Sequence, residues 1–217
     1  MPLGRPTSLA AHAFIFAAVA SRFAEWMKLD MPAVVLKALP VLILTWGVWA
    51  HGRRDRNRML IVVGLLLSAL GDVLLAWPAD LFVPGLIAFL LAHITYIAAF
   101  VRQERRPAAP WLVPFVAVGG GVFAYLFGGL GDLLIPVAAY VVVITAMAWR
   151  AGALVGRVSG GSAAVLGASL FLLSDSLLAI NKFGHPFTMA SEAIMWSYWG
   201  AQFWIARSAM PLRTVKP

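Results

Sequence analysis

The stretch MLIVVGLLLSALGDVLLAW, residues 59–77, is an apolar run that contains a single charged residue, Asp72. It is long enough to cross the hydrocarbon core of a membrane as one helix, which takes about 20 residues. A second run, SAAVLGASLFLLSDSLLAI at residues 162–180, places Asp175 in a similar local frame. The chain therefore carries an aspartate at matching positions of two segments that are expected to be buried in lipid.

Composition places the whole chain among membrane proteins. Of its 217 residues, 62% are hydrophobic and 12% are charged, and the mean hydropathy is +0.87, whereas about a quarter of the residues of a soluble domain are charged. We predict an all-α polytopic membrane protein, with residues 1–217 forming one membrane-embedded domain of about eight transmembrane helices. The predicted spans are residues 8–25, 33–51, 59–77, 82–101, 110–128, 132–150, 162–180 and 187–207.

The basic residues are unevenly distributed between the two sides of this predicted bundle. The net charge is +8, but with eight spans nearly all lysines and arginines fall on the side that holds both termini. Only Arg22, Lys28 and Lys182 are assigned to the other side, and Lys37 lies inside the second span. Cytoplasmic loops show this excess of positive charge, so we predict cytoplasmic N- and C-termini. We interpret the basic stretch at residues 51–58 as a topology signal; a specific site for anionic lipid or nucleic acid is the alternative.

The two aspartates are predicted to lie at one depth. Each is about 13 residues into its span, which puts both about 20 Å from the cytoplasmic end. A charged group inside the bilayer costs at least about 2.5–3.5 kcal/mol on insertion scales, so it normally faces the bundle interior and serves a function. Asp72 and Asp175 are therefore the leading candidate site residues.

Short similarities between the two halves of the chain suggest a duplication. Thr95-Tyr96 resembles Ser197-Tyr198 at nearly the spacing that separates the aspartates, and residues 39–41 (LPV) resemble residues 135–137 (IPV). We predict a 4+4 parallel internal duplication, a form in which the site tends to lie between the halves. A third Leu-Gly-Asp sequence ends at Asp132, which we expect to be the N-cap of the sixth span.

Several further polar residues fall within or at the ends of the predicted spans. Lys37 either extends toward the headgroups or pairs with a buried aspartate. His93, near the midplane, is either a hydrogen-bonding link between helices or part of the site. The candidates for binding or orienting a substrate are Lys37, His93, Tyr96, Tyr140, Asn181, Lys182 and Tyr198.

The motif content narrows the chemistry. The sequence has no HExxH motif, no cysteine, no GxSxG elbow and no Walker-type phosphate loop, so we predict no metal and no cofactor. What remains is a pair of carboxyls in an apolar bundle, where one tends to hold a proton while the other is ionised. Such a pair suits general acid and base catalysis, and it suits proton-coupled transport equally well.

Five stretches resemble the YhhN family of lysoplasmalogenases. They are residues 71–75 (GDVLL), 93–96 (HITY), 171–183 (FLLSDSLLAINKF), 37–40 (KALP) and 198–202 (YWGAQ). The resemblance covers essentially the whole chain. One departure is Ala38, which follows Lys37 where many members of the family have a proline.

The resemblance implies a non-metal ether hydrolase of the bacterial inner membrane. Its lysophospholipid substrate would be a lysoplasmalogen, cleaved at the vinyl ether bond to a fatty aldehyde and a glycerophospho-ethanolamine or -choline. Asp72 and Asp175 would be the catalytic acid and base, in an order that the sequence leaves open. The lipid bilayer is the other expected partner, and no nucleic acid is expected. The alternative hypotheses are a small proton-coupled transporter and a structural membrane partner.

Overall fold

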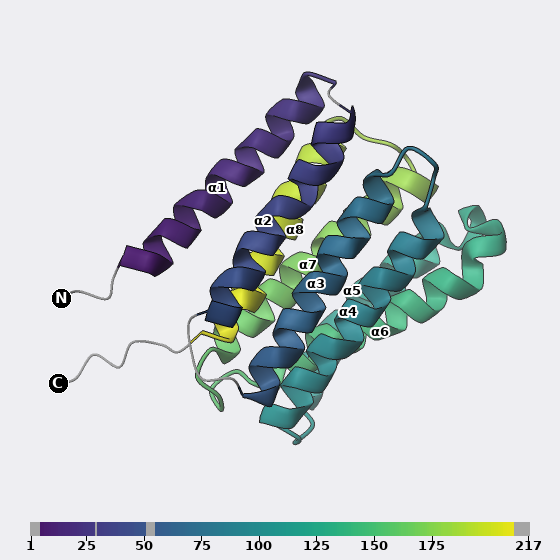
Figure 1. Ribbon diagram of the computed structural model, residues 1–217. Helices are drawn as coiled ribbons and strands as arrows, with labels where there is room; N and C mark the ends of the chain where they lie inside the picture. The colour runs from purple at the N-terminus through teal and green to yellow at the C-terminus, as the bar shows by residue number, and fades with distance from the viewer. Residues whose placement is uncertain (1–4, 29, 51–54, 211–217) are drawn as a thin grey trace.

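The computed structural model describes residues 5–28, 30–50 and 55–210 of the chain, and eight α-helices run through this part (Figure 1). Each helix overlaps one of the predicted spans, so the all-α prediction is confirmed. The helices are α1 (Arg5–Trp26), α2 (Asp30–Ala50), α3 (Arg56–Ala76), α4 (Phe82–Gln103), α5 (Ala109–Leu126), α6 (Leu134–Gly152), α7 (Gly161–Phe183) and α8 (Ala190–Ser208).

Five of these helices, α3 to α7, are long and apolar enough to cross a membrane. Helix α2 contributes the shorter apolar stretch Val34–Ala50, and neither α1 nor α8 reaches the same length and hydropathy within the described residues. Large apolar side chains point outward along the bundle, including Phe16, Val63, Val113 and Val142. This distribution is expected where lipid, rather than water, surrounds the helices. The count of eight spans stays a prediction.

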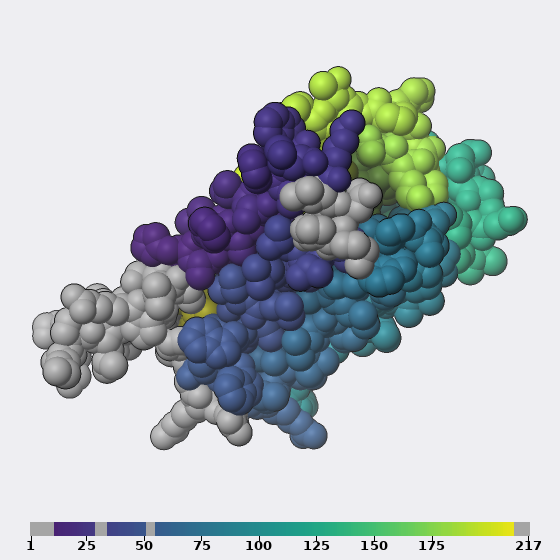
Figure 2. Space-filling model, turned by 45° about the horizontal axis from the view of Figure 1, so that its top comes forward, coloured from purple at the N-terminus to yellow at the C-terminus, as the bar shows by residue number. Residues whose placement is uncertain are grey.

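Helices that are adjacent in sequence pack as pairs, and the pairs then pack together. The α3–α4 and α7–α8 pairs have the most extensive contacts, α2 lies against both α3 and α8, and α6 lies against both α4 and α7. Helix α1 lies at one edge of the molecule, and the link between α5 and α6 lies at the opposite edge (Figure 2). Buried alanines such as Ala92, Ala99, Ala168 and Ala201 let the helices approach closely.

The two ends of the bundle differ in charge. Arg102 Nε donates to Asn57 Oδ1 at 3.2 Å, and Arg150 donates to the carbonyl of Glu104, so the start of α3 and the ends of α4 and α6 lie at one end of the bundle. We call this the basic end, after Arg56, Arg102, Arg106, Arg150 and Arg157. At the opposite end, Arg22 Nε donates to Glu192 Oε1 at 2.9 Å.

The start of α6 differs from the prediction. Asp132 lies in a 3-10 turn, Gly131–Leu133, and the N-cap of α6 is Leu133 without any side-chain hydrogen bond. The predicted N-cap role of Asp132 is therefore wrong. Gly131 has a φ of +50°, which only glycine adopts readily, and this lets the chain make two successive tight turns before the helix begins.

Candidate active site

Asp72 lies deep in the bundle, on the face of α3 that meets α8. Its side chain is 2% exposed, and its Oδ2 accepts a hydrogen bond of 2.7 Å from the Tyr198 hydroxyl. Lys37 of α2 lies near enough to attract the Asp72 carboxylate electrostatically, although the two form no direct ion pair. The pairing of Lys37 with a buried aspartate stays a prediction.

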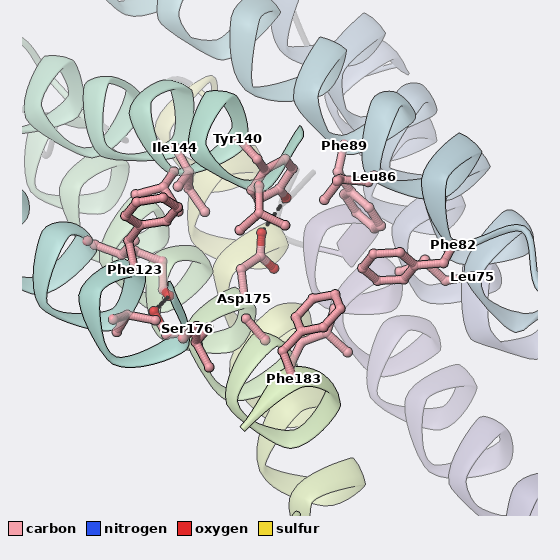
Figure 3. Close-up of a pocket in the computed structure, with 18 residues that line it drawn as sticks. Leu75, Phe82, Leu86, Phe89, Phe123, Tyr140, Ile144, Asp175, Ser176 and Phe183 are labelled. Carbon is pink, nitrogen blue, oxygen red and sulfur yellow. Dashed lines mark hydrogen bonds between the residues drawn. The ribbon is translucent and has the colours of Figure 1, made fainter. Parts of the chain in front are cut away.

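Asp175 has a tyrosine partner as well, but a different environment. Its Oδ2 accepts a hydrogen bond from the hydroxyl of Tyr140, and the two side chains point toward each other from α7 and α6 (Figure 3). Asp175 is half-buried and lines a pocket formed by α3, α4, α5, α6 and α7. Apart from Asp175, Tyr140 and Ser176, the pocket is lined by apolar residues, with Phe82, Phe89, Phe123 and Phe183 around it.

His93 stands between the two aspartate–tyrosine pairs. It is fully buried on α4, with its ring centroid 5.3 Å from that of Tyr140 and 4.6 Å from that of Phe171, both edge to face. The Phe171 ring in turn meets the Tyr198 ring at 5.5 Å. Both ring nitrogens of His93 lack a hydrogen-bond partner within the described part of the chain. A buried imidazole in this condition is available to a water molecule or a substrate.

Tyr96 belongs to a polar layer beside Asp72. Its hydroxyl donates to Gln202 Oε1 at 3.1 Å and lies 3.4 Å from Ser68 Oγ. Ser68 and Gln202 are fully buried and were not among the sequence-based candidates. Each lies one helical turn from a candidate, Ser68 from Asp72 and Gln202 from Tyr198, so a search for polar residues at i±4 could have found them.

The two candidates at the end of α7 lie apart from the buried pairs. Lys182 Nζ is 4.4 Å from the ring centroid of Phe82 and 6.0 Å from that of Phe183, two residues that line the pocket. Asn181 Oδ1 accepts a 3.4 Å hydrogen bond from the backbone N–H of Phe187. Lys182 is thus placed at the rim of the pocket, while Asn181 holds the following loop.

The arrangement brings ionisable oxygens together with apolar space. In the described residues, no three His, Asp or Glu side chains converge as a set of metal ligands. The two carboxyls do not hydrogen-bond to each other; each is held by a phenol from a different helix. Such an arrangement can donate or accept a proton beside an apolar molecule.

Comparisons with known proteins agree on one family. The sequence model of the YhhN family matches residues 33–209. Human "Lysoplasmalogenase TMEM86B" is 38% identical over 191 residues, which cover 87% of this chain and 81% of the relative. Bovine "Lysoplasmalogenase TMEM86A" is 34% identical over 212 residues, covering 91% and 88%.

A bacterial relative agrees with the mammalian ones. The "Lysoplasmalogenase" of Mycobacterium tuberculosis is 38% identical over 179 residues, covering 78% of this chain and 67% of the relative. No solved structure matches the chain significantly. The matched segment of the family model contains both aspartates, both tyrosines that bond them, and every other candidate residue. The protein therefore belongs to the YhhN family.

Proposed function

We propose that this protein is a lysoplasmalogenase, which hydrolyses the vinyl ether bond of a lysoplasmalogen to a fatty aldehyde and a glycerophospho-ethanolamine or -choline. The observation that carries the proposal is the Asp175 carboxyl, held by Tyr140 at an apolar pocket. The relatives named lysoplasmalogenase support it independently.

The pocket suits the hydrocarbon part of such a lipid. It is partly open to the outside, and its lining is aromatic and aliphatic apart from a few polar groups, as is typical of small-molecule sites. Its apolar lining matches an alkenyl chain, and Asp175 is the one carboxyl on that lining. Lys182, beside the ring of Phe82 at the rim, would meet the phosphate of the same lipid.

In the proposed mechanism, Asp175 is the acid. Its neutral carboxyl transfers a proton to the outer alkene carbon of the vinyl ether, and the ether carbon becomes an oxocarbenium ion. Water adds to that carbon and loses a proton to a carboxylate, which gives a hemiacetal. The hemiacetal collapses to the aldehyde and the free glycerol hydroxyl. Glycosidases use the same division of labour between two carboxyls.

Asp72 is the charged partner in this proposal. Burial disfavours its charged form, and the nearby Lys37 and the hydrogen bond from Tyr198 offset part of that cost. The negative charge of the carboxylate would favour the oxocarbenium ion. His93, with two unpartnered ring nitrogens beside Tyr140, orients the attacking water. Tyr96 supports Tyr198 through the Gln202 layer.

We further propose that all eight helices cross the membrane as two related halves, α1–α4 and α5–α8, with both termini in the cytoplasm of a bacterial cell. The packing of α4 on α6 and of α8 on α2 supports the relation between the two halves, because a twofold rotation that exchanges the halves also exchanges these two contacts.

The topology is tested with single cysteines, because the chain has none of its own. Asp80→Cys places a thiol just before α4, and Arg105→Cys places one just after it. A membrane-impermeant maleimide added to intact cells should label only Asp80→Cys; labelling of Arg105→Cys would reverse the topology.

The activity is tested by aldehyde release from purified protein in detergent. A lysoplasmalogen should be cleaved, while the saturated ether and the ester analogues should not. In H₂¹⁸O, the glycerol hydroxyl of the product should stay unlabelled because water adds to the alkenyl carbon. Label in the glycerol product, or cleavage of the ester analogue alone, would contradict the mechanism. Substrate-driven proton flux in proteoliposomes without aldehyde release would instead support transport.

The assignment of roles has a separate test. A small carboxylic acid should restore turnover to Asp175→Ala in proportion to its undissociated form, so rescue should weaken as the pH rises. Rescue of Asp72→Ala should follow the carboxylate form and strengthen as the pH rises. If the two pH dependences are exchanged, the roles of the two aspartates are exchanged as well.

A further inference from the structure

A second pocket lies at the basic end of the bundle, away from the candidate active site. It is formed where α3 begins and where α4 and α8 end, and it holds about 640 Å³ of unfilled space that opens to the outside. Its charged and amide lining includes Arg56, Asn57, Arg58 and Arg102. Leu75, the residue of α3 that lines the first pocket, is 17 residues beyond Arg58, which is about 26 Å along the helix, so the two pockets are separate sites.

Arg58 is the unusual residue of this pocket. Its side chain is 7% exposed, and its Nη2 donates to the backbone carbonyl of Ala209 at 3.0 Å. Nε and Nη1 of the same guanidinium have no hydrogen-bond partner within the described residues. Buried charged groups are costly unless they are paired and hydrogen-bonded. An anion bound beside this guanidinium would lower that cost.

The rest of the lining adds positive charge rather than neutralising it. Arg56 and Arg102 are exposed, and Arg102 is oriented by the hydrogen bond from its Nε to Asn57 Oδ1. No described carboxylate forms an ion pair with Arg56, Arg58 or Arg102. The one carboxylate on the lining, Asp55, caps α3 by accepting from the Arg58 backbone N–H at 2.9 Å. Three guanidiniums therefore face a single acid that is already engaged.

We propose that this pocket binds a phosphate group, carried by the headgroup of an anionic glycerophospholipid. Guanidinium groups match the geometry and charge of phosphate oxygens. The pocket lies at the ends of α3 and α4, two helices long and apolar enough to span the membrane, where phospholipid headgroups are found. Basic pockets between transmembrane helices commonly bind such headgroups.

Binding is measured by thermal unfolding of the full-length protein in detergent, so the test does not depend on the proposed activity. Phosphatidylglycerol at about 100 times its Kd should raise the Tm by about 5–10 °C, while phosphatidylcholine should not. Inorganic phosphate, matched in ionic strength by NaCl, distinguishes a soluble source. An equal rise with phosphate alone would keep the phosphate site but assign it to a free anion, and no rise with either would overturn the proposal.

Variants separate this pocket from general surface charge. Arg102→Gln and Arg56→Gln each remove one exposed guanidinium from the lining, and each should lose most of the rise in Tm. Arg105→Gln removes the same charge from an exposed position at the same end, outside the lining, and should keep it. An equal loss in Arg105→Gln would show that diffuse charge binds the lipid. Arg58→Lys keeps the charge without the planar guanidinium and should weaken binding further than Arg56→Gln.

Discussion

The Asp72 and Asp175 regions use the same pair of groups in different environments. In both, a carboxyl group accepts a hydrogen bond from a tyrosine of another helix. Asp72 is deeply buried beside the Tyr96–Gln202 layer and near Lys37, whereas Asp175 faces an apolar pocket. A repeated sequence motif therefore does not repeat its surroundings, and in the mechanism that we propose this difference allows one acid and one base.

The two tyrosines also differ in where they come from. Tyr198 reaches Asp72 from α8, across the predicted boundary between the halves, while Tyr140 belongs to the same half as Asp175. The Asp72 pair consequently ties the two halves together. The Asp175 pair is free to serve the pocket formed mainly by its own half.

The largest expected effect comes from removing either carboxyl. Asp72→Asn and Asp175→Asn should each lower kcat by about 10²- to 10⁴-fold, the usual contribution of a general acid or base. The check is aldehyde release at saturating lysoplasmalogen, with thermal unfolding to show that each variant is folded. A variant that turns over at the normal rate removes that residue from the chemistry.

A third aspartate provides the control for this prediction. Asp132 follows Leu-Gly as Asp72 does, but it is exposed, in the turn that precedes α6. Asp132→Asn should leave kcat unchanged. A loss comparable to that of Asp72→Asn would mean that the assay responds to general damage rather than to the buried pair.

The tyrosine partners should differ in importance. Tyr198→Phe deletes a hydrogen bond to a carboxylate that we propose is charged, worth about 1.5–3 kcal/mol, and should lower kcat about 10- to 100-fold. Tyr140→Phe deletes a bond to a neutral carboxyl and should cost about 5-fold. Tyr125→Phe, which loses an exposed hydrogen bond to His185, is the control and should be silent. The reverse order of Tyr198 and Tyr140 would argue for exchanged roles of the aspartates.

Narrowing the pocket should weaken the use of substrates with long alkenyl chains without changing the catalytic groups. Val122 of α5 lines the pocket, and Val122→Trp should lower kcat/KM several-fold for a long alkenyl chain and less for a short one, because the added ring occupies the chain's space. Val116→Trp, on the exposed face of the same helix, should change neither value. The measurement is kcat/KM as a function of alkenyl chain length for both variants. Equal profiles would mean that the lipid chain does not occupy this pocket.

The smallest effect on turnover should come from a change at Gly64, which packs against Tyr96 in the polar layer beside Asp72. A Cβ at this position would lie 2.7 Å from Cδ1 of Tyr96, so Gly64→Ala should destabilise the fold by about 1–3 kcal/mol through overpacking. Gly120 of α5 has nothing within 4 Å of an added Cβ, and Gly120→Ala should not destabilise. Thermal unfolding compares the two; equal stability would mean that Tyr96 moves freely.

Much of the fold could be predicted from the sequence. The apolar runs predicted all eight helices, and only their ends shifted by a few residues. The predicted N-cap of α6 at Asp132 was wrong, because the positive φ of Gly131 permits a turn that the Leu-Gly-Asp pattern does not reveal. The sequence named Asp72, Asp175, Tyr140 and Tyr198 as candidates but not the hydrogen bonds that pair them; their role in a site stays a prediction.

The sequence by itself determined that the chain is apolar and helical, where its helices lie, and that its two aspartates occupy matching positions of two apolar runs. These follow from local rules, since the length of an apolar run and the rise of a helix need no knowledge of neighbours. The tertiary structure decided which tyrosine each aspartate meets, that Lys37 lies near Asp72, and that the apolar pocket opens on Asp175. Those features depend on how closely helices pack and how they are rotated, which is set by side chains far apart in the sequence.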